Sequence, residues 1–177
     1  MTTPTPSPED YQHIKDKLYD YLSRQGFSER KLLQKVTDLK RRYPRTKRYL
    51  FYTPVHIQKV INELKATGVI NDQKYAQDVL RQLRDRKDGI HRIRQKMRQR
   101  LIPAPIIEKV LQTWQQSGVK QDYAAIICDA KRKYERLREK YPSKKDRYTI
   151  QSKLYAFLAQ KGYAPNEVKE IIGKLQL

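Results

Sequence analysis

Apolar residues recur at steps of three and four along nearly the whole chain. This spacing is typical of amphipathic α-helices, each with one buried side. The clearest run, behind Gly68, consists of Tyr75, Ala76, Val79, Leu80 and Leu83. Taken along the chain, the pattern predicts nine helices and no strand, and therefore an all-α fold.

Residues that favour helix ends stand between these runs. Ser28 and Thr53 are placed to cap the second and third helices, and Asn71 or Asp72 to cap the fourth. Gly26 follows the first helix, where we expect a left-handed stop. Glycines stand where four helices should end, at Gly26, Gly68, Gly118 and Gly162.

The predicted helices fall into three groups of three. The third helix of each group carries matching apolar residues, which are Ile57, Ile107 and Val168; Val60, Val110 and Ile171; Ile61, Leu111 and Ile172; and Leu64, Trp114 and Leu175. Such a match favours tandem repeats, which contact mainly their neighbours, so we expect an elongated and curved array. Chance agreement among amphipathic helices is the alternative.

The repeats are expected at residues 8–68, 69–118 and 119–177, behind a disordered lead at residues 1–7. Residues 40–53 form a basic and aromatic insertion in the first repeat. Within it, residues 40–52 hold six Lys or Arg and no acid, and they interrupt the helical pattern.

The net charge of the chain indicates what kind of partner it binds. The chain of 177 residues has 39 Lys and Arg against 19 Asp and Glu, for a formal net charge of +20. So much like charge destabilises a compact state through self-repulsion, which makes a polyanionic partner the economical explanation. Nucleic acid is the first candidate, followed by an acidic protein surface or an anionic membrane.

Residues 81–100 are the densest basic stretch, with nine Lys or Arg and only Asp85 and Asp88 as acids. Helical spacing places Arg92, Lys96 and Arg100 in one row and Arg94 with Arg98 in another. A solvated helix face is the alternative. The candidate residues for binding DNA or another polyanion are Arg92, Arg94, Lys96, Arg98, Arg100, Arg84, Arg41, Arg42, Arg45, Lys131, Arg132, Lys144 and Lys145.

Two predicted helix ends place tyrosines among cations, at residues 40–45 (KRRYPR) and 138–145 (REKYPSKK). Tyrosines so placed could stack on unpaired bases while the cations hold phosphates, or they could belong to the core. We expect Tyr43 and Tyr141 in the core, because each continues the apolar stripe of its helix. For Tyr49 and Tyr52 both interpretations stay open.

Catalytic chemistry has little support. His13, His56 and His91 lie on three different predicted helices, and Cys128 is expected in the core beside Ile127. No glycine-rich phosphate loop precedes a Lys-Ser/Thr pair. We therefore expect no enzymatic activity, no cofactor and no metal. One cysteine leaves no internal disulfide, and neither a signal-peptide core nor a run of ~20 apolar residues is present, so we expect a cytoplasmic protein without membrane contact.

Three short motifs resemble the RecX regulatory proteins. Residues 68–76 (GVINDQKYA) resemble the family's central signature, with Asn71 where an acid is usual. Residues 89–97 (GIHRIRQKM), which lead to Leu101 and Ile102, are similar to its following helix. Residues 157–163 (FLAQKGY) resemble its C-terminal helix-turn. The resemblance extends over residues 18–175, and the segment at 40–52 is longer than the short members need.

This resemblance implies a fold of tandem three-helix repeats and a modulator of RecA, the recombinase that forms helical filaments on single-stranded DNA. It implies a monomer that binds along the groove of the RecA filament and usually lowers recombinase and ATPase activity. The leading hypothesis is that the basic face meets the DNA or acidic surfaces of this filament. The alternatives are a basic helical protein that binds single- or double-stranded DNA without a recombinase, and a helical adaptor for an acidic protein.

Overall fold

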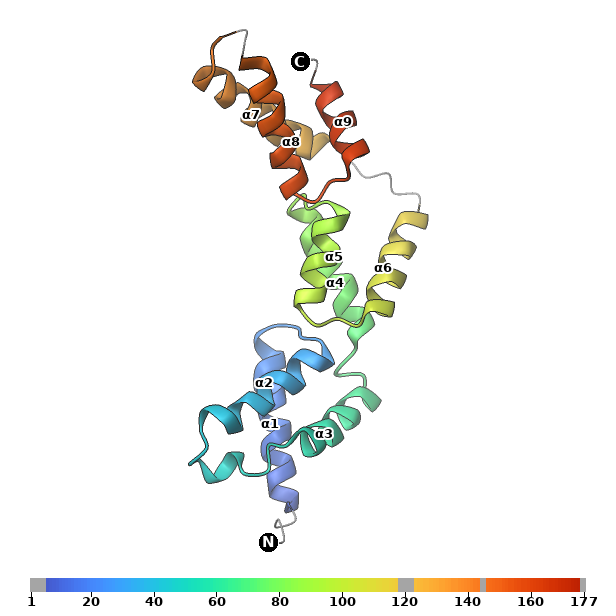
Figure 1. The fold of residues 1–177 in the computed structure, drawn as a ribbon. Helices are drawn as coiled ribbons and strands as arrows, with labels where there is room; N and C mark the ends of the chain where they lie inside the picture. Colours follow the sequence, from blue (N-terminus) through green and yellow to red (C-terminus); the bar gives the residue numbers. More distant parts are fainter. Residues whose placement is uncertain (1–5, 118–122, 144–145, 176–177) are drawn as a thin grey trace. The chain divides into compact units, whose positions relative to one another are not determined.

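The computed structural model describes residues 6–117, 123–143 and 146–175. Its helices are α1 (Pro8–Arg24), α2 (Glu29–Arg42), the short 3₁₀-helix η1 (Lys47–Tyr49), α3 (Pro54–Ala66), α4 (Asp72–Asp85), α5 (Ile90–Gln99), α6 (Ala104–Gln116), α7 (Ala124–Lys140), α8 (Arg147–Gln160) and α9 (Pro165–Lys174) (Figure 1). These residues include nine α-helices and no strand, so the all-α class is confirmed. Within this part of the chain, no helix is both long and apolar enough to cross a bilayer.

The chain divides into two compact units. Unit 1 comprises Met1–Gln77 and Arg98–Ile107, and unit 2 comprises Asp78–Met97 and Glu108–Leu177. Helices α1 to α3 belong to unit 1 and α7 to α9 to unit 2. The three helices between them, α4 to α6, contribute residues to both units.

The predicted caps of α2, α3 and α4 are confirmed. The side-chain oxygens of Ser28, Thr53 and Asn71 accept hydrogen bonds from the backbone N–H three residues further on, at 3.3, 3.4 and 2.9 Å. Each bond satisfies a donor that the first helical turn leaves without a partner. Local sequence therefore sets where these three helices begin.

Two residues at helix starts also join segments of unit 1 that are far apart in sequence. The Ser28 hydroxyl donates to the Arg100 carbonyl at 2.6 Å, and Ser28 is fully buried. The Asp72 carboxylate accepts from the Glu29 N–H at 2.8 Å. Asp72 was the alternative cap for α4, and it instead ties the start of α4 to the start of α2.

The core of unit 1 is formed by α1, α2 and α3 together with the segment after η1. Its buried residues are Ile14, Leu18, Phe27, Leu32, Val36, Leu39, Tyr52, Ile57, Val60, Ile61, Leu64 and Ile70. Tyr52 is 2% exposed, and its hydroxyl donates to the His13 carbonyl at 3.0 Å. Burial raises the pKa of Tyr52 to about 12, so this core hydroxyl keeps its proton near neutral pH.

The expectation that Tyr43 belongs to the core is wrong, because its residue surface is 53% exposed. Helix α2 ends at Arg42, and Tyr43 follows with φ −127° and ψ 62°. These are not helical angles, so helical spacing no longer predicts where this side chain lies. Tyr141 follows α7 with similar angles, φ −129° and ψ 74°, but it is half-buried against Leu137, Ile150 and Leu154. Its expected place in the core is therefore confirmed in part, and the two tyrosines differ in what packs beside them.

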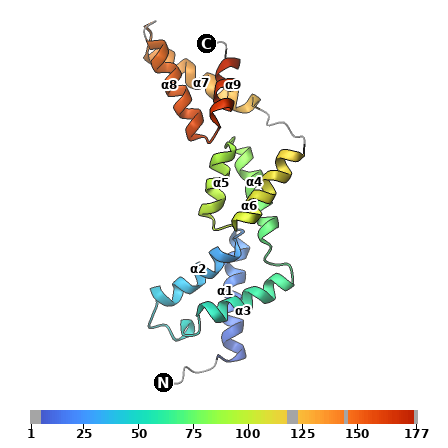
Figure 2. The same ribbon diagram turned by 45° about the vertical axis from the view of Figure 1, so that its right-hand side comes forward.

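Helices α7, α8 and α9 pack against one another in unit 2, and they lie side by side in both views (Figures 1 and 2). The buried residues of α7 are Ile126, Ala130 and Leu137, which share one side of the helix. Cys128 lies two residues from Ile126, about 200° around the helix axis. It is exposed, so its predicted place in the core is wrong.

Gly26 has a role that differs from a left-handed helix stop. Among the described glycines, positive φ angles occur at Gly68 (75°) and Gly162 (89°) but not at Gly26, so the left-handed stop expected at Gly26 is wrong. Helix α1 ends instead in extended backbone at Gln25. Gly26 is in close contact with Tyr75, because a Cβ placed on it would lie 2.8 Å from a ring carbon.

Backbone contacts join the α4–α5 loop to the α8–α9 loop within unit 2. The Gly89 N–H donates to the Lys161 carbonyl at 2.8 Å, and the His91 N–H donates to the Gly162 carbonyl at 3.2 Å. A Cβ on Gly89 would overlap the Gly162 backbone, and one on Gly162 would overlap Arg92. We call this contact the glycine joint; it has no room for a side chain at either glycine.

Replacing Gly89 with alanine should therefore destabilise the protein by roughly 1–3 kcal/mol, the usual cost of overpacking. Gly173→Ala is the matched control, because Gly173 lies in α9 and a methyl group added there would have no neighbouring atom within 4 Å. That change should be neutral or stabilise by up to about 1 kcal/mol. Chemical denaturation of both variants measures the difference, and equal stabilities would show that the two loops are not held together.

Candidate nucleic-acid interface

The predicted binding residues are divided between the two units. Unit 1 holds Arg41, Arg42, Arg45, Arg98 and Arg100, and unit 2 holds Arg84, Arg92, Arg94, Lys96, Lys131 and Arg132. Lys144 and Lys145 lie outside the described residues. The structure therefore brings these cations together in smaller groups, each with its own surroundings.

Asp88 binds two of the three cations in the predicted row on α5. Its side chain is only 3% exposed; Oδ1 lies 3.3 Å from Arg92 Nε and Oδ2 lies 2.6 Å from Lys96 Nζ. Arg92 also donates from Nη1 to the Gln160 carbonyl at 2.7 Å, next to the glycine joint. A buried carboxylate needs such partners, since an isolated charge in the interior is costly. Arg92 and Lys96 thus stabilise unit 2 itself.

In the second predicted row of cations on α5, Arg94 also has a carboxylate partner. Arg94 donates to both carboxylate oxygens of Glu108, from Nε at 2.9 Å and from Nη2 at 3.0 Å. This paired geometry is the stronger form of a charged hydrogen bond, and it joins α5 to α6 within unit 2. In unit 1, Arg98 is exposed and Arg100 is half-buried. Three cations of α5, namely Arg92, Arg94 and Lys96, therefore have carboxylate partners in the same chain.

Sequence reasoning counted Asp88 only as an acid that lowers the local charge. Its spacing carried a signal, because Asp88 and Arg92 are four residues apart, which places them on neighbouring turns. Lys96 is four residues further along the same side. What the spacing could not show is the burial of Asp88, which decides how strongly the two cations are held.

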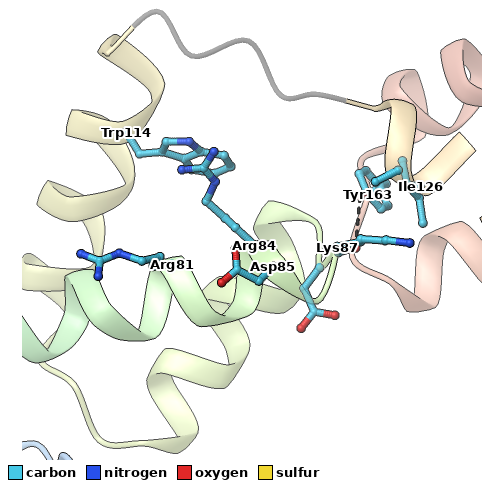
Figure 3. Close-up of a pocket in the computed structure, with 9 residues that line it drawn as sticks. Arg81, Arg84, Asp85, Lys87, Trp114, Ile126 and Tyr163 are labelled. Carbon is cyan, nitrogen blue, oxygen red and sulfur yellow. Dashed lines mark hydrogen bonds between the residues drawn. The ribbon is translucent and has the colours of Figure 1, made fainter.

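In unit 2, Arg84 and Trp114 line the same pocket and lie against each other (Figure 3). The Arg84 guanidinium is 5.0 Å from the centre of the Trp114 ring, within range of a cation–π contact. The pocket measures about 250 Å³ and is lined by Arg81, Arg84, Asp85, Lys87, Asp88, Trp114, Ala125, Ile126 and Tyr163. A guanidinium stacked in this way keeps its N–H donors at its edge, where they can bind an anionic oxygen.

Helix α7 presents exposed cations that its sequence only partly revealed. Lys131 and Arg132 are both exposed. Arg136 and Lys140, which were not among the predicted residues, are exposed as well and follow Arg132 at four-residue steps. Their regular spacing was visible in the sequence, but two intervening glutamates made the stretch look less basic than residues 81–100.

In unit 1 the cations cluster where α2 ends. Arg41, Arg42 and Arg45 are exposed, as are Lys47 and Arg48. Arg41 lies 3.4 Å from Asp38, with the arginine side chain 78% exposed. Cations in the last turn of a helix also interact favourably with the helix dipole, which accounts for part of this density. Beyond the helix end, that explanation no longer applies.

The described residues contain no group of three His, Cys, Asp or Glu side chains that could hold a metal ion. The exposed groups described above are Arg and Lys donors together with aromatic rings. Such groups bind phosphates, carboxylates and planar bases.

Comparison with known proteins relates the chain to RecX regulatory proteins. Residues 71–111, which comprise α4, α5 and the beginning of α6, match the family model described as RecX, second three-helix domain. A regulatory protein RecX from Streptococcus uberis is 35% identical over 122 residues. The chain is therefore similar to RecX regulatory proteins.

The chain spans about half the length of the RecX relatives it matches. The aligned residues cover 68% of this chain and 43% of the Streptococcus uberis protein. A regulatory protein RecX from Clostridium botulinum strain Eklund 17B is 29% identical over 121 residues, covering 68% of this chain and 54% of the relative. The crystal structure of RecX from Lactobacillus salivarius has the same fold, with a TM-score of 0.69 at 20% identity over 96% of this chain and 99% of that chain.

The motifs that resemble RecX serve mainly to build the fold. Asn71 and Asp72 of the central motif hold the start of α4. Gly89 and Gly162, from the other two motifs, meet in the glycine joint. The exposed cations of α2 and α7 lie outside all three motifs. In this chain, the likeness to RecX and the exposed candidate binding surface are therefore carried by different residues.

Changing Asp88 to asparagine should lower the free energy of unfolding by roughly 1.5–3 kcal/mol, the range for hydrogen bonds to charged groups. The loss should stay below that of a fully buried pair, because Arg92 and Lys96 are 38% and 26% exposed. Glu170→Gln is the control: it removes the pair with Lys174 in which both side chains are 50% exposed. It should cost less than about 1 kcal/mol. Similar denaturation midpoints for both variants would contradict a structural role for Asp88.

Proposed function

We propose that this chain regulates RecA, as the RecX family name implies, by binding the filament that RecA forms on single-stranded DNA and lowering its recombinase and ATPase activity. What supports this function is the similarity of the chain to RecX regulatory proteins. The formal net charge of +20 supports a polyanionic target. Binding along the filament groove would slow its growth or the rearrangement of its subunits, and it requires no bond chemistry from this protein.

The proposed contact surface rests on one observation: some predicted cations have carboxylate partners, and others are exposed. Arg92, Arg94 and Lys96 have carboxylate partners in unit 2. The cations along α7 and at the end of α2 are exposed, and these can contact DNA phosphates or acidic filament surfaces with little loss of internal structure. The exposed cations proposed for filament binding are Arg41, Arg42, Arg45, Arg84, Arg98, Lys131 and Arg132.

This division also decides which substitutions can test the proposal. Glutamates at positions 92 and 96 would surround a buried Asp88 with like charge, so loss of activity could reflect unfolding. Lys131 and Arg132 are exposed on α7, where charge reversal leaves the buried residues Ile126, Ala130 and Leu137 in place. They are therefore the better probes of binding.

The variant Lys131→Glu/Arg132→Glu should weaken inhibition of the DNA-dependent ATPase of RecA by at least about tenfold, since each reversal replaces attraction to a polyanion with repulsion. ATP hydrolysis and filament length are measured together. Lys153→Glu/Lys169→Glu makes the same change in net charge at exposed positions of α8 and α9 and should retain inhibition. Equal loss in both variants would mean that only total charge matters.

Binding should also depend steeply on salt. If six or more phosphates are contacted, affinity should fall by ~10³ or more between 50 and 200 mM salt. Anisotropy of labelled DNA, with and without RecA, measures this slope. A flat response would contradict a phosphate contact. Inhibition that is fully explained by competition for bare DNA, and is lost at sub-stoichiometric protein, would favour the basic DNA-binding protein without a recombinase partner.

A further inference from the structure

Three tyrosines in the segment between α2 and α3 run from the core of unit 1 to its surface. The innermost, Tyr52, is 2% exposed and is held by its hydrogen bond to the His13 carbonyl. The Tyr49 ring centre lies 4.9 Å from that of Tyr52, and the Tyr43 ring centre lies 6.0 Å from that of Tyr49. Tyr43, the outermost, is 53% exposed. We call these residues the tyrosine series.

This arrangement supports the outer ring from one side. Tyr52 is anchored in the core, Tyr49 packs against the core and Tyr52, and Tyr43 packs against Tyr49. Tyrosine has only two side-chain torsions, so a ring supported in this way loses little further freedom when a ligand binds. The exposed remainder of Tyr43 is a preorganised aromatic surface.

The segment that carries this surface is rich in exposed positive charge. Residues 40–52 contain six Lys or Arg and no acid. Five of these cations are exposed, namely Arg41, Arg42, Arg45, Lys47 and Arg48. An aromatic ring among cations matches the two features of a single-stranded nucleic acid, which has a planar base and a phosphate at every nucleotide. In a duplex the base faces are already stacked on one another, and an acidic peptide offers carboxylates without planar faces.

We propose that Tyr43 is a stacking platform for an unpaired base of single-stranded DNA, with Arg42, Arg45 and Arg48 contacting the adjacent phosphates. This site acts without a recombinase and goes beyond the filament-binding function proposed above. Base stacking on Tyr43 gives unit 1 a preference for single strands that phosphate contacts alone do not provide. Modest preference among the bases follows from stacking strength, because every base has a π face.

The test compares two labelled probes of equal phosphate number, an oligothymidine and an abasic oligonucleotide, by fluorescence anisotropy with the full chain. The wild-type protein should bind the oligothymidine more tightly. Tyr43→Ala should lower that affinity by about 5- to 100-fold, as expected for loss of one stacked base, and leave affinity for the abasic probe unchanged. Tyr43→Phe, which keeps the ring, should bind like wild type.

Tyr148→Ala is the matched control, since Tyr148 is 82% exposed on α8, outside the tyrosine series, and its removal should change neither affinity. Thermal melting of each variant checks the fold. Equal wild-type affinity for the two probes, equal affinity for polyglutamate, or equal effects of Tyr43→Ala and Tyr148→Ala would each overturn the platform. The RecA ATPase assay is separate: normal inhibition by Tyr43→Ala together with unchanged oligothymidine binding overturns the platform and leaves the filament proposal standing.

Discussion

The α4–α5 loop and the α8–α9 loop of unit 2 approach so closely that neither Gly89 nor Gly162 has room for a side chain. Backbone hydrogen bonds at 2.8 and 3.2 Å cross this contact. The hydroxyl of Tyr163 also donates to the Lys87 carbonyl there, at 3.1 Å. Buried backbone groups need such partners, and two glycines allow the loops to supply them to each other directly.

The charge network of α5 is built around this joint. Asp88 precedes Gly89 and holds Arg92 and Lys96, while Arg92 reaches on to the Gln160 carbonyl just before Gly162. The densest basic stretch of the chain is therefore also one of the most internally connected. Cations in such a network are restrained by their partners, so they are poorly suited to follow a flexible polyanion. Within the part of the chain that the structure describes, the exposed cations on α7 and at the end of α2 have no such restraint from a buried carboxylate.

This separation explains how the chain can share a fold with the RecX of Lactobacillus salivarius at 20% identity. The requirements of such a fold are caps, close backbone contacts and buried apolar positions, and few residues of each helix satisfy them. Surface cations are not needed for the fold; their positions depend instead on contact with a partner. The segment between α2 and α3 is an example, because it combines a buried tyrosine that serves the core with an exposed tyrosine and cations that do not.

Helix content, helix starts and the buried stripes could be predicted from the sequence because they depend on local spacing. The caps at Ser28, Thr53 and Asn71 are cases in which three residues of chain determine the hydrogen bond. Periodicity also gave the all-α class, and short motifs indicated the RecX family.

Tertiary structure alone decided which polar and aromatic groups are available. Tyr43 and Tyr141 follow their helices with similar backbone angles, but Tyr43 is exposed and Tyr141 packs against buried residues of unit 2. Tyr52 enters the core of unit 1 through a turn that has no periodic signal. Charge density along α5 suggested a binding surface, but burial of Asp88 reassigned two of its cations to the fold. The physical reason is range: helix formation depends on residues three or four apart, while the availability of a side chain depends on every segment that packs beside it.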